Sequence, residues 1–389
     1  MSKNESLSDD VYQASIAKEP IAAYDKLRQS CPVKHDEHLH WTLFKHADVL
    51  STIKDHETFS SQVSKHVSVP NGMDPPEHTV YRKLIDPYFN AQRMADFEAA
   101  CQQIADALVE AAPKNTEFDL IENFARIYAV QVQCAFLGWP ESIQAPLTAW
   151  VRKNHQATLA QDRSAMADIA LEFDGFIRDL LETRRAAGEQ ASDDLTTALM
   201  RETVDGQVLA DEVIVSILRN WTVGELGSIA ACVGIVVNYL AEHPELQQQL
   251  REETDSTSLD VAIDEILRIH PPLISNRRVT TKEVTLGGVT IAEKERLTIL
   301  WASANRDEEV FGDPDAYCPV RNAEHNLLYG AGIHYCPGAP LARLVLRQVT
   351  RALLRDVQDF VLSSDKTPVH AKYPAGGFDS LVLRLLVGK

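Results

Sequence analysis

The sequence has few cysteines, and their spacing excludes two common ways of stabilising a small fold. No CxxC pair occurs, so neither a disulfide framework nor a zinc finger is indicated. Any cysteine with a function is therefore expected to act alone. The six cysteines of the 389-residue chain are Cys31, Cys101, Cys134, Cys232, Cys318 and Cys336.

The chain also has no linker, no repeat and no excess of positive charge. No Pro/Gly/Ser-rich stretch, internal period or low-complexity tract offers a place to divide it. Its 45% hydrophobic and 24% charged residues are typical of a water-soluble globular protein. The net charge of −18 argues against a general nucleic-acid binder, although it does not exclude a local basic docking patch. We expect residues 1–389 to form one large domain and a monomer.

No segment has the pattern of a secretion signal or a membrane anchor. Residues 1–20 are polar and lack the apolar core of a signal peptide. The longest apolar segment, residues 213–240, is interrupted by Arg219 and Glu225, so no uninterrupted run reaches the roughly 20 residues that span a bilayer. We expect a cytoplasmic protein without a membrane span. The segment is predicted to be a buried central helix, with small residues where another group approaches its backbone; a plain core helix is the alternative.

Hydrophobic periodicity predicts a mainly helical protein with a smaller, segregated β part. Helical spacing begins at residues 47–54 and dominates the chain from about residue 90 to 245. The strand patterns are a first strand at residues 40–44, a hairpin in residues 279–300 around Gly287 and Gly288, and the C-terminal SLVLRLLV.

The strongest chemical signal is the segment 329–343, YGAGIHYCPGAPLAR. Glycines at positions 330, 332 and 338 free the backbone to turn tightly beneath a flat ligand, and a helix follows. The N-terminus of that helix would stabilise Cys336 as a thiolate. A lone cysteine is more often a small buried hydrophobic residue, and the residues by themselves leave that alternative open.

This segment resembles the haem-binding loop of the cytochrome P-450 family, in which a cysteine thiolate is the axial ligand of the haem iron. The resemblance implies that Cys336 binds the iron of haem b and that the chain has the mainly helical fold of that family. Tyr329 departs from the phenylalanine usual in the family, but it keeps an aromatic ring beside the sulfur. The general resemblance extends over nearly the whole chain.

A second motif lies upstream, where Glu265 and Arg268 share one helix face before two prolines. Such charge pairs are common surface features that contribute only tenths of a kcal/mol. The position nevertheless matches the ExxR motif of the family, which is paired with a later arginine, here Arg321. The resemblance assigns these three residues a structural role in supporting the haem face.

Haem carries two propionates, so a protein that buries it must supply cations or hydrogen-bond donors. Four residues match the propionate contacts of the family: His78 and Arg82 in DPPEHTVYR, Arg278 after the ExxR helix, and His334 in the cysteine loop. The alternative for each is a solvated surface charge.

The central helix departs from the family at its distal acid–alcohol pair. The alcohol is present as Ser228, but Gly227 stands where the acid is expected. Glu225 precedes the serine by three residues and so lies on the same helix face. We expect Glu225 to take over proton delivery while Ser228 holds bound dioxygen or a water. The alternative is that Glu225 pairs with Arg219 or another interior cation.

The resemblance implies a haem-thiolate monooxygenase that inserts one oxygen atom from O2 into an organic substrate. The pocket walls that it implies, residues 63–69, 220–228, 273–276 and 377–378, are mostly apolar or small. We therefore expect a small, largely apolar substrate and hydroxylation or oxidative O- or N-dealkylation. A peroxide-driven peroxygenase and a non-catalytic haem sensor are the alternatives.

Electrons are expected from an external partner, a ferredoxin or flavodoxin-type reductase system that uses NAD(P)H, because no flavin or iron–sulfur module precedes Lys389. Its docking surface would lie on the cysteine side, with Arg82, Lys83 and Arg343 as candidate cations. Short segments, among them NWTV at 220–223, look like a bacterial subfamily that includes thiocarbamate-herbicide oxidisers and self-sufficient reductase fusions.

A small metal site is a weaker interpretation of His35, His38 and His40. His38 and His40 would share one face of a strand. The edge of a surface strand explains these residues better.

Overall fold

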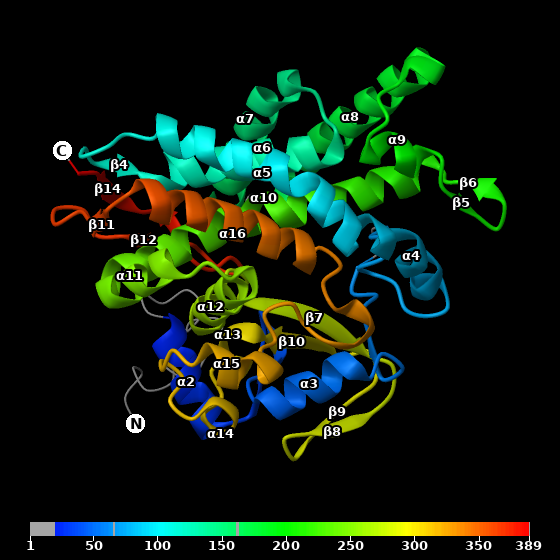
Figure 1. The fold of residues 1–389 in the computed structure, drawn as a ribbon. Helices are drawn as coiled ribbons and strands as arrows, with labels where there is room; N and C mark the ends of the chain where they lie inside the picture. The colour runs from blue at the N-terminus through cyan, green and yellow to red at the C-terminus, as the bar shows by residue number, and fades with distance from the viewer. Residues whose placement is uncertain (1–19, 65–66, 161–162, 389) are drawn as a thin grey trace.

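The computed structural model describes residues 20–64, 67–160 and 163–388. Figure 1 shows a layer of long helices, including α5, α6, α10 and α16, over a smaller part that contains the largest sheet. Residues 1–20, which were expected to lack a signal peptide and a membrane anchor, lie outside the described residues apart from residue 20.

The helices are α2 (Pro20–Ser30), α3 (His46–Lys54), α4 (Glu77–Ile85), α5 (Ala91–Ala111), α6 (Arg126–Leu137), α7 (Gln144–Ala160), α8 (Arg163–Ala187), α9 (Leu195–Met200), α10 (Asp211–Glu242), α11 (Pro244–Glu252), α12 (Ser256–Ile269), α13 (Trp301–Ala304), α14 (Glu308–Phe311), α15 (Pro319–Asn322) and α16 (Ala339–Asp356).

The strands form small, separate sheets. The largest has the order β1–β2–β10–β7–β3, in which β2 and β10 are parallel and the other neighbours antiparallel. A three-stranded sheet has the order β11–β14–β4, and the pairs β5–β6, β8–β9 and β12–β13 stand alone. The strands are β1 (Val33–Asp36), β2 (His40–Leu43), β3 (Phe59–Ser60), β4 (Phe118–Asp119), β5 (Thr203–Val204), β6 (Gln207–Val208), β7 (Ser275–Thr280), β8 (Val284–Leu286), β9 (Val289–Ile291), β10 (Arg296–Leu300), β11 (Asp359–Leu362), β12 (Val369–His370), β13 (Phe378–Ser380) and β14 (Val382–Leu386).

The predicted fold class, mainly helical with a smaller segregated β part, is confirmed. The strand expected at residues 40–44 is β2, and the helix that follows it is α3. The expected hairpin is β8–β9, and its turn residues Gly287 and Gly288 have φ values of 54° and 79°. Glycine adopts this left-handed conformation without the steric cost of a side chain. The C-terminal segment divides at Leu381 between β13 and β14.

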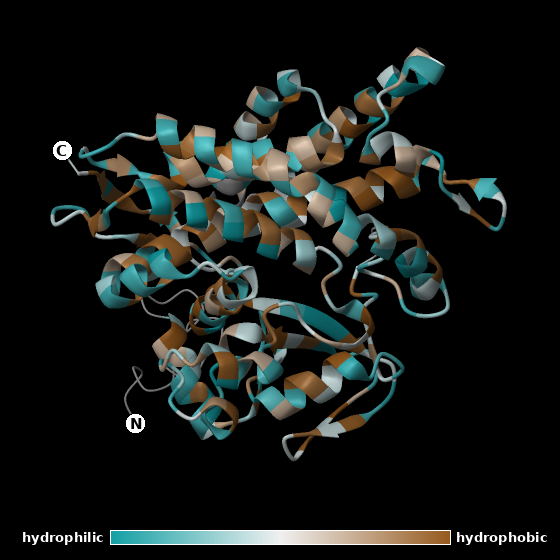
Figure 2. Cartoon of the chain, in the orientation of Figure 1, coloured by the Kyte–Doolittle hydropathy of each residue, from teal (hydrophilic) through white to brown (hydrophobic). Residues whose placement is uncertain are grey.

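Helix α10 crosses the centre of the molecule, as the sequence predicted. By length and composition it could cross a membrane, but 61% of its most apolar window is buried inside the protein. It packs against α6, α8, α12 and α16, and the colouring of Figure 2 shows hydrophobic stretches along this layer of helices. Its hydrophobicity is therefore explained by its place in the core.

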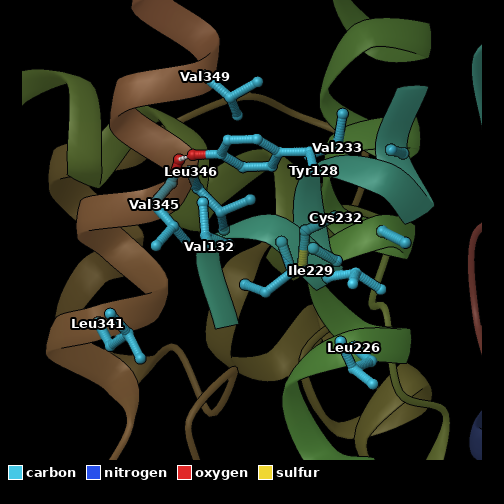
Figure 3. Packing of buried hydrophobic residues seen from close by; sticks show 14 of the residues in the cluster. Tyr128, Val132, Leu226, Ile229, Cys232, Val233, Leu341, Val345, Leu346 and Val349 are labelled. Atoms are coloured by element: carbon cyan, nitrogen blue, oxygen red, sulfur yellow. Dashed lines mark hydrogen bonds between the residues drawn. The ribbon is translucent and has the colours of Figure 1, made fainter. Parts of the chain in front are cut away.

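The core around α10 fixes the position of α16, the helix that follows the cysteine loop. Figure 3 shows side chains of α6, α10 and α16 meeting, with Tyr128 of α6 directed at α16. The Tyr128 hydroxyl donates a hydrogen bond of 2.6 Å to the carbonyl of Val345. Leu346 of α16 and Val233 of α10 are also fully buried in this cluster. Close packing leaves α16 little freedom to move relative to α10.

Candidate functional site

The cysteine loop turns beneath the N-terminus of α16, and two of its glycines have left-handed backbone. Gly330 and Gly332 have φ values of 70° and 69°. A Cβ on Gly332 would lie 2.7 Å from the carbonyl oxygen of Ile53 at the end of α3, so only glycine fits there. The N–H of Cys336 donates to the carbonyl of Tyr329, which closes the turn. The glycines thus allow the tight turn that the sequence predicted.

Two opposing effects act on the pKa of Cys336. The backbone N–H groups of Gly338 and Ala339 donate to the sulfur and lower its pKa, as the helix N-terminus should. Burial acts in the opposite direction and is the larger effect, and the nearby Glu225 adds to it, so the pKa of Cys336 rises to about 11. An adjacent metal cation would supply the missing stabilisation of the anion.

Glu225 faces the cysteine loop across the space between α10 and α16. Its Oε1 atom lies 2.9 Å from the point where a Cβ of Gly338 would stand, and the Cys336 sulfur lies 3.9 Å from the same point. Burial raises the pKa of Glu225 to about 8. Within the described residues its carboxylate has no hydrogen bond or ion pair.

The alternative in which Glu225 pairs with Arg219 is wrong, because Arg219 has another partner. Its guanidinium binds both carboxylate oxygens of Asp174 at 2.8 Å. Glu225 is therefore a half-buried acid without a compensating cation in the described part of the chain.

The same stretch of α10 has an exposed side, which is called the opening below. Val223 is 41% exposed although it lies in the middle of a central helix, and Gly224 and Gly227 are exposed as well. The Ser228 hydroxyl donates to the carbonyl of Gly224 at 2.6 Å, one turn back along the helix. The lone pairs of the Ser228 oxygen can therefore still accept a hydrogen bond from a donor in the opening.

Three of the four predicted propionate residues, His78, Arg278 and His334, lie together in a cluster whose charge is carried by Arg278. The rings of His78 and His334 lie 4.4 Å apart, although they come from α4 and from the cysteine loop. Arg278 of β7 is only 7% exposed and, among the described residues, forms no ion pair. Burial lowers the pKa of Arg278 to about 10 and that of His334 to about 3, the latter with help from Arg278 and His78.

This cluster fits an anionic group such as the two propionates of haem. The Nε2 atom of His78 is buried without a hydrogen-bond partner, and the NH1 of Arg278 donates only to the carbonyl of Arg277. Polar groups left in this state cost free energy unless a ligand satisfies them. The carboxylate of Asp74 is nearby but is already bound by Ser60 and by the backbone of Ser61.

Arg82, the fourth predicted residue, already has protein partners. It pairs with Asp86 at 2.9 Å and donates to the carbonyl of Tyr335 at 2.8 Å, which fastens α4 to the cysteine loop. Sequence reasoning missed Ser61, whose hydroxyl is hydrogen-bonded to Nε2 of His334 at 2.9 Å. Nothing in the spacing of Ser61 distinguishes it from other loop serines.

Glu265 and Arg268 form a completely buried bidentate pair, with N–O distances of 2.8 and 3.0 Å. Glu265 also accepts from the N–H of Cys318 and the side chain of Asn322, while Arg268 donates to the carbonyl of Asn305. The pair therefore joins α12 to the segment that leads into the cysteine loop.

Arg321 does not contact this pair directly. It donates to the Asn322 side chain and to the carbonyl of Phe311, and Asn322 carries the contact to Glu265. Sequence reasoning had named Arg321 and missed Asn322, because the motif is recognised by its charged members and the amide bridge depends on the fold.

The remaining candidates are Arg343 and the histidines near β2. Arg343 pairs with Asp264 at 2.8 Å and lies over the Tyr329 ring. His40 opens β2 while His38 lies in the preceding turn, so the two do not share a strand face. The part of the chain that the structure describes contains no group of three His, Cys, Asp or Glu residues suited to a metal ion.

The structure describes most of the segments that were expected to form the pocket walls. Residues 67–69 lie against α10, as described below, whereas residues 65–66 of that wall are outside the described residues. A Cβ on Gly377 would lie 3.2 Å from Ile235 of α10, and Leu273 forms a backbone bridge with Ala375. The C-terminal turn and the segment after α12 thus meet beside α10.

Comparisons with known proteins agree with this site. The family model of cytochrome P-450 matches residues 142–374, more than half of the chain. Cytochrome P-450 109 of Bacillus spizizenii is 32% identical over 86% of this chain and 84% of that protein. The vitamin D(3) 25-hydroxylase of Pseudonocardia autotrophica is 30% identical over 96% of this chain and 92% of that protein.

Solved structures give the same result for the fold. A mutant of P-450 EryK in complex with erythromycin B has a TM-score of 0.84 and 26% identity, over 95% of this chain and 96% of that one. The ligand-free cytochrome P-450 TbtJ1 has a TM-score of 0.83 and 28% identity, over 94% and 96% of the two chains.

Replacing Glu265 by glutamine should strongly destabilise the protein. The variant keeps the shape of the side chain but leaves Arg268 as a buried cation without its counter-charge, a change that costs about 3–5 kcal/mol. Thermal unfolding measures the effect, and Glu293→Gln, in the exposed pair with Lys294, is the matched control with almost no change. Unfolding curves of Glu265→Gln that overlap the wild type would show that the buried pair does not hold this region.

Proposed function

The chain belongs to the cytochrome P-450 family, and from this premise we propose that it hydroxylates or oxidatively dealkylates a small, largely apolar organic molecule. Members of the family are monooxygenases that contain haem b and use O2 and a small-molecule substrate. The observation that carries the proposal is the single cysteine under α16, facing Glu225 of α10, on the same side as the buried Arg278 and the rings of His78 and His334. We treat residues 1–389 as one haem domain.

Five residues are proposed to hold the cofactor. Cys336 would be the metal ligand, and His78, Arg82, Arg278 and His334 would bind the propionates. The support is their convergence from three separate elements, the buried Nε2 of His78 that has no hydrogen-bond partner, and the burial of Arg278 without an ion pair among the described residues. When bound, haem b supplies the iron centre at which dioxygen is reduced and one oxygen atom is transferred.

Ser228 and Glu225 are proposed to handle protons on the α10 side. Ser228 would position dioxygen or a water through its hydroxyl, which is already held by the Gly224 carbonyl. Glu225 is supported by its place opposite the cysteine loop and by its raised pKa, since an acid that ionises near neutral pH can both bind and release a proton.

The substrate class is proposed from the residues around the opening. Val223, which is exposed beside two glycines of α10, offers apolar surface without a charge. Relatives named for vitamin D(3) and for linalool show that the family accepts apolar molecules of different size. Small apolar molecules are the class that such walls would hold without leaving polar groups unpaired.

A ferredoxin or flavodoxin-type protein is proposed as electron donor, docking on the cysteine side of the molecule. Lys83 is the exposed candidate cation, since Arg82 and Arg343 are engaged in ion pairs. Consumption of NADH that depends on a surrogate redox system and on substrate would distinguish this function from a peroxide-driven enzyme and from a sensor.

Replacing Cys336 by serine should abolish the thiolate spectrum of the haem protein. A neutral hydroxyl cannot replace an anionic sulfur ligand. The measurement is the absorption of the reduced protein with carbon monoxide, with Cys318→Ser as the control that keeps the wild-type band. A Cys336→Ser variant with the wild-type band would reject the ligand assignment.

Replacing Arg278 by alanine should weaken haem retention without changing the axial ligand. The variant removes a buried charge-assisted contact, worth about 1.5–3 kcal/mol, or roughly tenfold or more in the rate of haem loss. Transfer of haem to apomyoglobin measures that rate. Arg277→Ala, the exposed neighbour, is the control; equal rates for both variants and the wild type would remove Arg278 from the propionate site.

Replacing Glu225 by glutamine should separate substrate binding from product formation. Loss of the proton carrier slows product formation and diverts reducing equivalents to hydrogen peroxide, while binding is preserved. Product formed per NADH is the measurement, and Ser228→Ala combined with Glu225→Gln should be little worse than either alone if both serve one path. Normal coupling together with reduced thermal stability would instead make Glu225 a structural residue.

A further inference from the structure

Residues 67–69, next to the opening, are bound to α10 by three side chains of that helix. The Ser216 hydroxyl donates to the carbonyl of Val67 and accepts from the N–H of Val69, both at 3.0 Å. The Asn220 amide donates to the carbonyl of Val69 at 2.9 Å and is hydrogen-bonded to the hydroxyl of Ser68. The polar groups of this loop are therefore directed into the helix.

Arg219 binds the same loop and a third element. One of its guanidinium nitrogens donates to the carbonyl of Val67 at 3.0 Å, and the other binds Asp174 of α8 through both carboxylate oxygens. Both side chains are only about one quarter exposed, 28% and 24%. A single half-buried side chain thus connects α8, α10 and residues 67–69.

The helix face that binds the loop continues into the site. Ser216, Asn220, Val223 and Gly227 follow one another at intervals of three or four residues, which places them on one face of α10. The last two are exposed on this face, one to three turns along the helix from the residues that bind the loop. Residues 67–69 consequently cover α10 directly beside the region where substrate would bind.

We propose that Arg219 is a positioning residue for the substrate pocket, holding residues 67–69 against α8 and α10 so that a ligand passes when the Arg219–Asp174 pair opens. The inference rests on the proposed function only for placing substrate beside α10. Because α10 satisfies the carbonyls of Val67 and Val69, the loop offers a ligand chiefly aliphatic surface. Uncharged, apolar molecules are the class that this arrangement admits.

The same two helices carry a control for this role. Arg178 of α8 pairs with Glu212 of α10 at 3.5 Å, and Arg185 pairs with Asp211. Neither pair binds residues 67–69 in the part of the chain that the structure describes. They should hold α8 on α10 without affecting the loop.

The test is the kinetics of a probe ligand, 4-phenylimidazole, binding to the haem-loaded protein, followed by the Soret shift in stopped flow. Arg219→Met should raise the association and dissociation rates about tenfold, since one ion pair and one charged hydrogen bond are lost. Asp174→Asn should raise both rates less and abolish their increase with ionic strength, because the screened pair is gone. Arg178→Met should match the wild type.

A second measurement is independent of haem chemistry. Hydrogen exchange at the Val69 amide, which donates to Ser216, should be faster in Arg219→Met and Asp174→Asn than in Arg178→Met. If the protein binds no haem, the proposed function is wrong. The exchange rate of the Val69 amide still tests whether Arg219 holds residues 67–69. Wild-type rates and exchange in Asp174→Asn and Arg219→Met, or equal changes in Arg178→Met, would overturn the proposal.

Discussion

The buried pair of Glu265 and Arg268 is the interaction on which the cysteine loop depends. Two charges removed from water are tolerated only when their remaining hydrogen-bonding capacity is filled. Here Cys318 and Asn322 donate to the carboxylate, and the Asn305 carbonyl accepts from the guanidinium. The side-chain oxygen of Asn305 in turn accepts from the N–H of Leu327, just before the loop. The support of the loop therefore has one well-defined position.

The site above that support shows the opposite arrangement, because its charges have few partners. Buried donors of His78 and Arg278 stand on one side, and the carboxylate of Glu225 stands across from Cys336. Such groups destabilise a protein unless a ligand completes them. Their presence beside a fully satisfied ion pair supports the proposed site between α10 and the cysteine loop.

Helix α10 links the core, the site and the access loop through different faces of one element. Its apolar faces pack on α6 and α16 (Figure 3), while one polar and glycine-containing face runs from the loop contacts to the opening. Ion pairs to α8, among them Arg219 with Asp174, lie at its N-terminal half. Residues 67–69 are therefore connected to α8 as well as to α10.

The family, the mainly helical fold, the central helix and the cysteine could be predicted from the sequence, because each depends on local spacing. The glycines of the loop follow from the rule that left-handed backbone favours a residue without a Cβ, and α10 follows from its long, largely apolar segment. The partners of charged residues could not be predicted in this way. Arg219 with Asp174, Arg343 with Asp264 and the Asn322 bridge each join residues that only the fold brings together. A charge can be read from a sequence, but its partner is set by which surfaces the packing of the core places in contact.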